Sequence, residues 1–196
     1  MVIKLRNAKI ERNTSETQIS LDINLDGLGN SDIEVDNKFL THMLTTLSKH
    51  SLIDIKLKAV GDLDHHLVED VGIAIGTVLK KALGDKKGIK RFGNAIIPMD
   101  EALARVAIDL GGRGYCIYDL KCQLEIVEDL PVSLIEHFFE AFASNSEINL
   151  HITVLDGKDD HHKLEAVYKA LAISLKIATA IDPRISDIIP STKGVI

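Results

Sequence analysis

The sequence predicts an α+β protein built by internal duplication of a β-β-α-β-α unit, in which each half is a small sheet with helices on one face. Apolar residues alternate with polar ones along some segments and recur at helical spacing along others. These two periods are typical of half-buried strands and amphipathic helices. An HHxxE motif also occurs twice, at residues 65–69 and 161–165. Because the order of elements and the motif both return after about 95 residues, duplication is the simplest explanation.

The first half supplies one complete unit. Alternating Ile19, Leu21 and Ile23 mark a strand, and Gly27 and Gly29 follow it as a turn. Apolar residues then recur every three or four positions after Asp36, which is a good N-cap. The expected elements are strands at 2–10, 17–25 and 52–60, and helices at 36–50 and from Asp64 to the stop at Gly84.

The second half repeats this order. Two strands are expected within residues 104–122 on either side of Gly111 and Gly112, followed by a helix at 132–145, a strand at 147–155 and a helix from Asp160 to about Ala180. His42 then corresponds to His137, and the first HHxxE to the second. We expect a first repeat at 1–92, a second at 93–183, and a tail at 184–196. The bare sheet faces would be buried by packing the halves together or against another subunit.

Composition excludes several classes of protein. A net charge of −6 argues against a general nucleic-acid surface, although a small anion could bind wherever the basic residues gather. No apolar run is long enough for a membrane span, and the first residues lack the apolar core of a secretory signal. A cytoplasmic location is therefore expected. Cys116 and Cys122 have neither redox nor metal spacing, which favours plain reduced thiols.

The histidines indicate metal binding. Six of the eight belong to the duplicated pattern, with a single helical histidine 23 or 24 residues before each HHxxE. One copy alone would be typical of an exposed helix start, but two matched copies are not. Imidazole and carboxylate ligands suit Mn, Fe, Co, Ni or Zn.

Helical geometry assigns the adjacent histidines to different ions. At 100° per residue, His66 diverges from His65 by about 100° and Glu69 by about 40°, and all three point away from the apolar stripe of their helix. We expect two metals, each taking one histidine from each motif and a further ligand from His42, His137 or a glutamate. Some ligands would come across a subunit contact, and the glutamate that serves each ion stays open.

Other polar residues near these motifs have two interpretations. Asp64 and Asp160 suit helix caps, with orientation of an imidazole as the alternative. His50 is either a helix C-cap or part of a ligand pocket, and His151 lies on the polar face of a strand, where a structural or solvated role is expected.

Basic residues predict a phosphate site. Lys169 shares the helix face of Glu165, whereas Arg91 and Arg113 lie beside glycines that allow close approach of a ligand. Ser191, Thr192 and Lys193 add hydroxyls, amides and an ammonium group in the tail. Each is an ordinary surface residue by itself, and together they would form a phosphate cradle.

These motifs resemble the imidazoleglycerol-phosphate dehydratases of histidine biosynthesis over nearly the whole chain. The resemblance rests on FLTHMLTTLSKH, DHHLVEDVGIAIG, MDEALARVAIDLGGR, EHFFEAFASN, DDHHKLEAVYKALA and IPSTKG in the family's order. It implies a ribosomal protein S5 domain 2-like fold, two Mn²⁺ per subunit at subunit contacts, and an octahedral homo-oligomer of 24 subunits. The implied reaction eliminates water from imidazoleglycerol phosphate, a small phosphorylated imidazole, to give imidazole acetol phosphate.

The resemblance also implies roles for individual residues. Glu16 would be the catalytic acid/base. The implied metal ligands are His42, His65, His66, Glu69, His137, His161, His162 and Glu165. The implied substrate contacts are Glu16, His42, His50, His65, Glu69, Arg91, Arg113, His161, Lys169, Ser191, Thr192 and Lys193.

The sequence departs from the family before the first motif, where Gly61, Asp62 and Leu63 run directly into the histidine pair instead of a longer segment. A two-metal phosphate-ester hydrolase is an alternative, but such sites usually rely on bridging carboxylates rather than imidazoles. Purely structural metals and metal storage are further alternatives. The presence of Glu16 and the PSTKG tail argues against purely structural metals, and nothing in the sequence suggests the iron-oxidising carboxylate cluster of a storage protein.

Overall fold

The first half of the chain forms a four-stranded sheet with two helices on one face. The computed structural model describes residues 6–196, so residues 2–5 of the strand expected at 2–10 lie outside the described residues. The strands are β1 (Asn7–Asn13), β2 (Thr17–Asn24), β3 (Ser31–Val35) and β4 (Asp54–Gly61), and the helices are α1 (Lys38–Ser51) and α2 (Asp64–Leu83). The strand order is β1-β2-β4-β3, with only β3 and β4 parallel.

The second half repeats this topology. Its strands are β5 (Phe92–Met99), β6 (Ala102–Asp109), β7 (Tyr115–Asp119) and β10 (Asn149–Asp156), and its helices are α3 (Val132–Ser146) and α4 (Asp160–Thr179). The order is β5-β6-β10-β7, with β7 parallel to β10. A hairpin of β8 (Ile126–Val127) and β9 (Leu130–Pro131) precedes α3, and a short 3-10 helix, η1 (Pro183–Ile185), follows α4.

The α+β class and the duplication are therefore confirmed, and each four-stranded sheet carries one strand more than expected, while the β8–β9 hairpin was not expected either. In the first half this is β3, whose residues are only partly buried and do not alternate cleanly. In the second half it is β5, an edge strand that contains Gly93 and Pro98. Proline is tolerated at a sheet edge because one side of the strand needs no hydrogen-bond donors, but it weakens the strand signal in the sequence.

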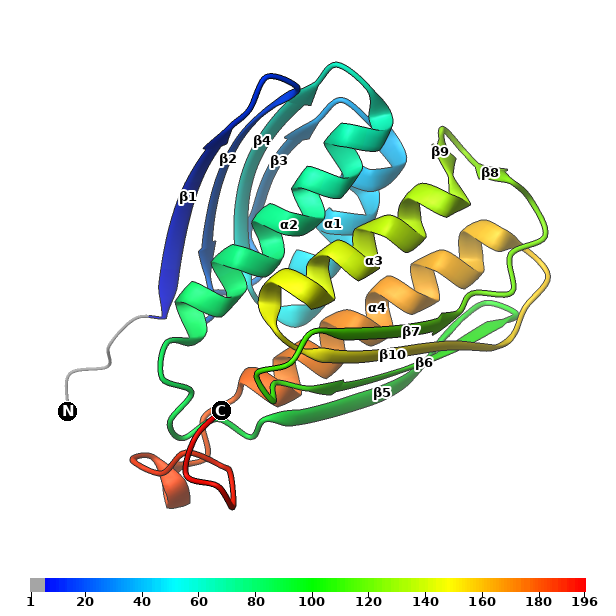
Figure 1. Cartoon of the computed structure of the whole chain (residues 1–196). Coiled ribbons are helices and arrows are strands. Elements are labelled where there is room, and N and C mark those ends of the chain that lie inside the picture. The colour runs from blue at the N-terminus through cyan, green and yellow to red at the C-terminus, as the bar shows by residue number, and fades with distance from the viewer. Residues whose placement is uncertain (1–5) are drawn as a thin grey trace.

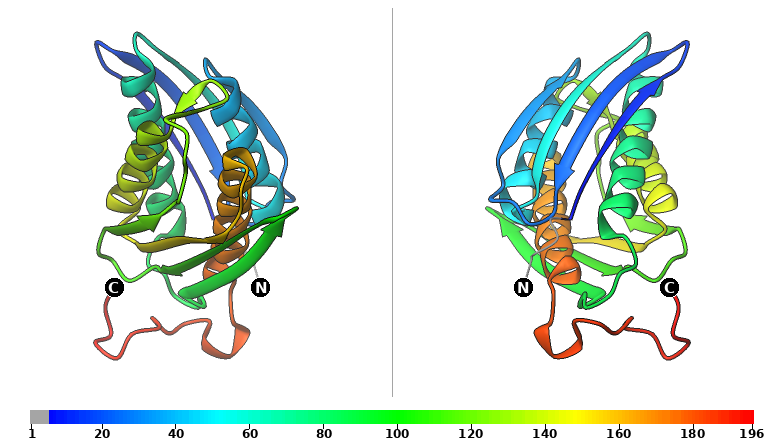
Figure 2. Two further views of the ribbon diagram at one scale, coloured as in Figure 1. Left: turned by 90° about the vertical axis from the view of Figure 1, so that its right-hand side faces the viewer. Right: turned by 90° about the vertical axis from the view of Figure 1, so that its left-hand side faces the viewer.

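The four helices form a layer between the two sheets (Figures 1 and 2). Helix α2 packs against α3 and α1 against α4, so each contact joins one half to the other. The inward residues of the strands, such as Leu21 and Leu57, are fully buried, and their outward neighbours are exposed. Within the chain, the halves thus meet through their helices, and the outer faces of both sheets remain uncovered.

The helix starts differ from the expected caps. Asn37 rather than Asp36 caps α1, because its side chain accepts a hydrogen bond from the Leu40 amide. Helix α2 begins after Leu63 with no side-chain cap, so Asp64 does not cap it. Asp159 caps α4 by accepting hydrogen bonds from the amides of His161 and His162.

Asp160 has a different role from the cap that was expected. It is buried and accepts hydrogen bonds from Lys163 Nζ at 2.7 Å and from the Gln123 and Leu124 amides at 2.7 and 2.8 Å. These bonds join the start of α4 to the segment that leaves β7.

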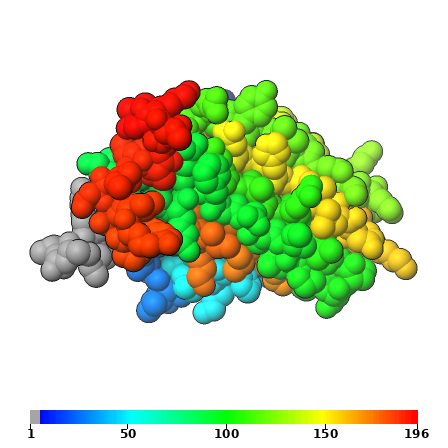
Figure 3. All heavy atoms as spheres, turned by 90° about the horizontal axis from the view of Figure 1, so that it is seen from below, coloured from blue at the N-terminus to red at the C-terminus, as the bar shows by residue number. Residues whose placement is uncertain are grey.

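The C-terminal tail gathers at one end of the molecule, beside the last turn of α4 (Figure 3). Its first residues pair with the loop before β5 through a bridge between Ile89 and Ile181. No helix in residues 6–196 combines the length and apolar character that a membrane crossing needs. Cys116 and Cys122 are free thiols, and burial raises the pKa of each to about 12, which keeps them protonated and unreactive.

Candidate metal centre and substrate site

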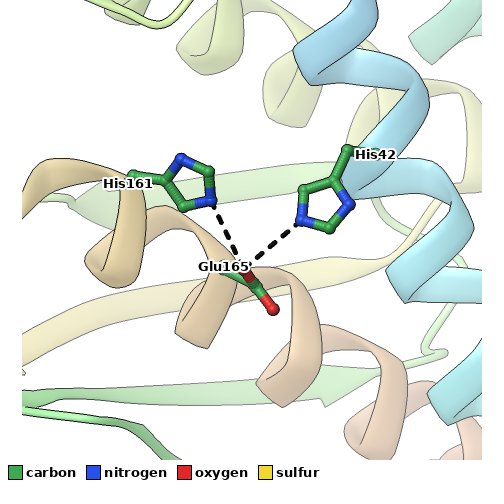
Figure 4. Close-up of side chains that lie close together, drawn as sticks. All are labelled: His42, His161 and Glu165. Carbon is green, nitrogen blue, oxygen red and sulfur yellow. Dashed lines mark hydrogen bonds and ion pairs between the residues drawn. The ribbon is translucent and has the colours of Figure 1, made fainter.

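One histidine and carboxylate cluster lies between α1 and α4 (Figure 4). His42 Nε2 and His161 Nε2 both lie 3.4 Å from Glu165 Oε2. The donor atoms of these three residues lie within 4.8 Å of one another, and no other group of residues between 6 and 196 meets that criterion. We call His42, His161 and Glu165 the first centre.

Glu165 is held in place before any ion arrives. Its side chain is only 11% exposed, and Lys169 Nζ, one helical turn further on, donates to Oε1 at 2.9 Å. Burial alone would raise the pKa of Glu165, but the hydrogen bonds from Lys169 and His42 outweigh it and lower the pKa. The carboxylate is therefore ionised and ready to bind a cation.

A related cluster lies between α2 and α3, and we call His65, Glu69 and His137 the second centre. The His65 and His137 rings are 5.1 Å apart between centroids, and His65 Nε2 lies 3.7 Å from Glu69 Oε2. His137 Nδ1 is near Glu140 rather than Glu69, at 3.8 Å. The Glu69 side chain is 48% exposed, so this centre is more open than the first.

Both centres take residues from the two halves of the chain. Each combines an HHxxE motif from one half with the single helical histidine of the other half. The sequence led us to expect one histidine from each HHxxE motif on the same ion, but the structure does not bring the two motifs together within one chain.

His66 and His162 point away from both centres, as the helical wheel predicts. The His65 and His66 rings are at 90° to one another, and the His161 and His162 rings at 83°. His66 Nδ1 lies 2.7 Å from Asp62 Oδ1, and this hydrogen bond raises the pKa of His66.

His162 is held in a similar way by the other half. Its Nδ1 lies 2.8 Å from Glu101 Oε2, which raises the pKa of His162. Glu101 Oε1 accepts hydrogen bonds from the Lys158 and Asp159 amides. The bond from the Asp159 amide, then the one from His162, and then other backbone bonds lower the pKa of Glu101 to about 2.

Carboxylates thus orient imidazoles here, but not the ones that the sequence suggested. Within residues 6–196, Asp64 and Asp160 contact no imidazole, whereas Asp62, Glu101 and Glu128 each meet an Nδ1 atom. These three residues lie in turns, and only their position in the fold shows their role. Glu101 follows β5 in the way that Glu16 follows β1, a correspondence hidden by the different lengths of the two halves.

The donor atoms fit a first-row divalent ion. An Nδ1–H that donates to a carboxylate leaves the Nε2 lone pair free for a metal, which is the usual arrangement around metal-binding histidines. Imidazole nitrogen and carboxylate oxygen are the ligands that Mn, Fe and Zn accept. The first centre brings three such donors together within one chain, and the more open second centre offers the same residue types.

An open pocket of about 470 Å³ adjoins the first centre and is lined by Lys38, Phe39, His42, Glu128, Asp129 and His161. A smaller hollow between Asp22, Asp54 and Lys56 contains none of the predicted site residues. The pocket beside the first centre is therefore the better candidate for a ligand.

His50 lies further along the same pair of helices. Partial burial, and then the charge of Lys169, lower its pKa, so its imidazole stays neutral near that ammonium group. The faces of α1 and α4 thus carry His42, His161, Glu165, Lys169 and His50 in succession. His151 is exposed on β10, away from these residues.

Apart from Lys169, the expected phosphate residues lie at the other end of the molecule. Arg91 donates to Asp109 at 2.7 and 3.1 Å and to the Pro190 carbonyl at 2.8 Å, which ties the tail to β6. The turn that contains Arg113 contacts the end of the tail, since Gly112 lies against Ile196. Ser191, Thr192 and Lys193 follow Pro190 directly.

The cradle and the first centre therefore do not meet within one chain. The Arg91 amide donates to the carbonyl of Ala178, near the end of α4, whereas His161 is at its start. At a rise of 1.5 Å per residue, these two positions are about 26 Å apart along the helix. The three-carbon chain between an imidazole and a phosphate is far too short to span this separation.

Comparisons with known proteins agree with this site. The family sequence model described as imidazoleglycerol-phosphate dehydratase matches residues 35–175. The dehydratase of Granulibacter bethesdensis is 50% identical over 192 residues, covering 96% of this chain and 98% of that protein. The Dehalococcoides mccartyi dehydratase is 49% identical over 191 residues, covering 97% of each.

Solved structures agree as well. The crystal structure of the Staphylococcus aureus imidazoleglycerol-phosphate dehydratase superimposes with a TM-score of 0.83 at 37% identity, covering 90% of this chain and 99% of that one. The Pyrococcus furiosus structure gives a TM-score of 0.82 at 34% identity, covering 95% and 100%. The fold and these relatives define a hydro-lyase. The chain belongs to the imidazoleglycerol-phosphate dehydratase family, whose members act in histidine biosynthesis.

Proposed function

We propose that this protein removes water from D-erythro-imidazoleglycerol phosphate to give imidazole acetol phosphate, with two Mn²⁺ per subunit. The observation that carries the metal dependence is the pair of histidine and carboxylate centres, one between α1 and α4 and one between α2 and α3. Other first-row divalent ions fit the same donors.

The proposed ligands are the three residues of each centre together with His66 and His162. When bound, the ions would hold the ring nitrogens of the substrate and let the imidazole accept electron density as hydroxide leaves. His42, His65, Glu69 and His161 would also lie against the substrate. Glu165 is already ionised and anchored by Lys169, so it needs no rearrangement to serve as a ligand.

Glu16 is the proposed acid/base. It lies in the turn between β1 and β2, with Oε2 3.9 Å from His66 Nδ1 and a side chain that is 52% exposed. A carboxyl group beside a proposed ligand and open to a bound substrate can donate a proton to the leaving hydroxyl when it is protonated, or accept the proton from carbon when it is ionised.

Assembly follows from what a single chain lacks. His66 and His162 belong to neither centre of their own chain, and Ala178, which the Arg91 amide contacts, is about 26 Å along α4 from His161. We infer that another copy supplies these parts, in a homo-oligomer for which an octahedral 24-mer is the proposed form. The cytoplasm is the proposed location.

The phosphate would be bound by Arg91, Arg113 and the Ser191, Thr192 and Lys193 loop of one copy together with Lys169 of another, and His50 would be a further substrate contact. The Arg91 guanidinium group donates hydrogen bonds to Asp109 and to the Pro190 carbonyl in the tail. These bonds would hold in place the loop that binds the phosphate. The division into repeats at 1–92 and 93–183 with a substrate-binding tail at 184–196 stays a prediction.

The test supplies imidazoleglycerol phosphate and Mn²⁺ and follows the acetol phosphate product. We expect Glu16→Gln to lower kcat by about 10²- to 10⁴-fold, the usual contribution of a general acid or base. The matched control is Glu34→Gln on the outer face of the first sheet, where Glu34 forms an ion pair with Lys58, and its activity should equal that of the wild type.

Two outcomes would contradict parts of the proposal. Absence of product with the metal-loaded wild type would defeat the dehydratase function, whereas full activity of Glu16→Gln would defeat only the acid/base role. Sedimentation tests the assembly: a monomer that binds two Mn²⁺ tightly would contradict ligands shared between copies.

A further inference from the structure

The two proposed metal centres differ in what surrounds them. In the first half, β3 ends at Val35 and α1 begins at Lys38, so only Asp36 and Asn37 connect them. In the second half, residues 120–131 connect β7 to α3 and contain the β8–β9 hairpin. We call residues 120–131 the connecting segment. It has no counterpart in the first half, and it lies beside the first centre.

The connecting segment is fixed to both helices of that centre. Asp129 caps α1 from outside, because its two carboxylate oxygens accept hydrogen bonds from the Lys38 and Phe39 amides, each at 3.0 Å. At the other helix, Lys163 Nζ donates to the Lys121 carbonyl at 2.9 Å. The bonds from the Gln123 and Leu124 amides to Asp160 complete this attachment.

Glu128 lies at the tip of this anchored hairpin and reaches a ligand of the first centre. Its Oε1 is 3.0 Å from His161 Nδ1, while His161 Nε2 faces Glu165. The His161 ring also packs on Phe39, 5.2 Å away between centroids. The imidazole is therefore held on one edge by Glu128 and on one face by Phe39, with Nε2 directed into the centre.

In the second centre the His65 ring packs on His137, 5.1 Å away between centroids, but within the described residues it lacks an orienting carboxylate like Glu128. His65 lies within ion-pair distance of no carboxylate in residues 6–196 except Glu69, which would itself be a ligand. The position one turn after Glu69 is Ile73, whereas the same position after Glu165 is Lys169. Both ligands of α2 must therefore be ordered when the ion binds, which costs side-chain conformational entropy.

We propose that Glu128 is a positioning residue that orients His161, and that the first centre consequently binds its metal more tightly than the second and fills first. This inference rests on the metal centres proposed above. Carboxylates that orient a metal-binding imidazole typically change metal affinity by 10- to 100-fold when they are removed. The first equivalent of Mn²⁺ should accordingly bind at least about 10-fold more tightly than the second.

The experiment is a titration of the metal-free, full-length protein with Mn²⁺, in which the electron paramagnetic resonance signal reports the free ion. Two classes of site are expected. His42→Ala should abolish the tight class and His137→Ala the weak one, which assigns each class to a centre. Circular dichroism and sedimentation before titration check that each variant keeps its fold and assembly.

Glu128 variants separate orientation from structure. Glu128→Ala should weaken the tight class by about 10-fold and leave the weak class unchanged. Glu128→Gln keeps an oxygen that can accept from Nδ1–H and should restore most of the loss. Glu125→Ala is the matched control, because Glu125 is exposed in the same segment and its carboxylate has no partner there.

Several results would overturn the inference. A titration in which all sites bind Mn²⁺ with the same affinity would do so, and so would a tight class that survives His42→Ala. A Glu128→Ala variant that weakens both classes equally would also overturn it. Each of these results would leave the dehydratase function intact. A wild-type protein that binds no Mn²⁺ would instead defeat the proposed metal centres and this inference together.

Discussion

Replacing Gly76 by alanine tests how closely α2 must approach α3. A Cβ at position 76 would lie 2.6 Å from the Phe142 carbonyl oxygen and 2.9 Å from the Ser146 amide nitrogen. Gly72, one turn earlier, lies equally close to α3, with its Cβ position 2.8 Å from the Phe138 carbonyl oxygen. The obstacles are backbone atoms of a helix, which cannot rotate away as a side chain would.

The size of the effect follows from these distances. The new methyl group would be about 0.8 Å inside ordinary contact, and overpacking of this kind costs about 1–3 kcal/mol. Alanine regains about 0.5–1 kcal/mol relative to glycine in a helix. A net loss of about 1–2 kcal/mol corresponds to a Tm lower by about 2–8 °C for a chain of this length.

Thermal unfolding followed by circular dichroism measures this loss, and Lys81→Ala serves as the control. Lys81 is exposed on the same helix and its side chain has no partner in residues 6–196, so this variant should stay within about 0.5 kcal/mol of the wild type. Gly76→Ala should also weaken the Mn²⁺ class that His137→Ala removes, because α2 and α3 carry the second centre. A Gly76→Ala protein as stable as the wild type, or more stable, would refute the close-packing explanation.

Three further predictions concern other parts of the molecule. Arg91→Lys should raise the KM for the phosphorylated substrate more than it lowers kcat in steady-state assays, because a lysine cannot hold Asp109 and the tail carbonyl together; an unchanged KM would contradict the role of the tail. Lys163→Met should lower the free energy of unfolding in urea by about 3 kcal/mol, because it leaves Asp160 buried without its cation, and a loss below about 1 kcal/mol would show that the backbone bonds to Asp160 suffice. Burial raises the pKa of Asp54, but accepted backbone hydrogen bonds outweigh it and lower the pKa below the ordinary 3.8. The stabilisation from Asp54 is then present above pH 3.8 and is lost as the pH falls through the folded-state pKa. The difference in free energy of unfolding between the wild type and Asp54→Asn should therefore shrink on acidification. A difference that does not depend on pH would contradict this.

The duplication and the class of the fold could be predicted from the sequence because they rest on repeated, strongly periodic segments. The helices α2 and α4 carry clear apolar stripes, and the HHxxE motifs mark equivalent positions in both. The divergence of His65 from His66 also follows from helical geometry alone. These features depend on neighbours within one or two turns of the chain.

The remaining features depend on contacts between distant segments. Whether His42 meets His161 or another histidine is decided by which helices pack together, and both pairs cross between the halves. The contrast between buried Glu165 and exposed Glu69 has the same origin, since the two motifs are alike in sequence. The orienting role of Glu128 also escaped prediction, because a glutamate in a turn has no periodic signal.

The placement of each centre between two halves has a consequence for how the chain could have arisen. A single half would carry one HHxxE helix and one helix with a lone histidine, but it could not close a centre by itself. Two identical halves related by a twofold axis would close two identical centres. Fusing the halves into one polypeptide frees each copy to change separately, so that residues 120–131 could be added on one side alone. One centre could then be adjusted for tight retention of its ion while the other kept the openness that exchange of a ligand requires.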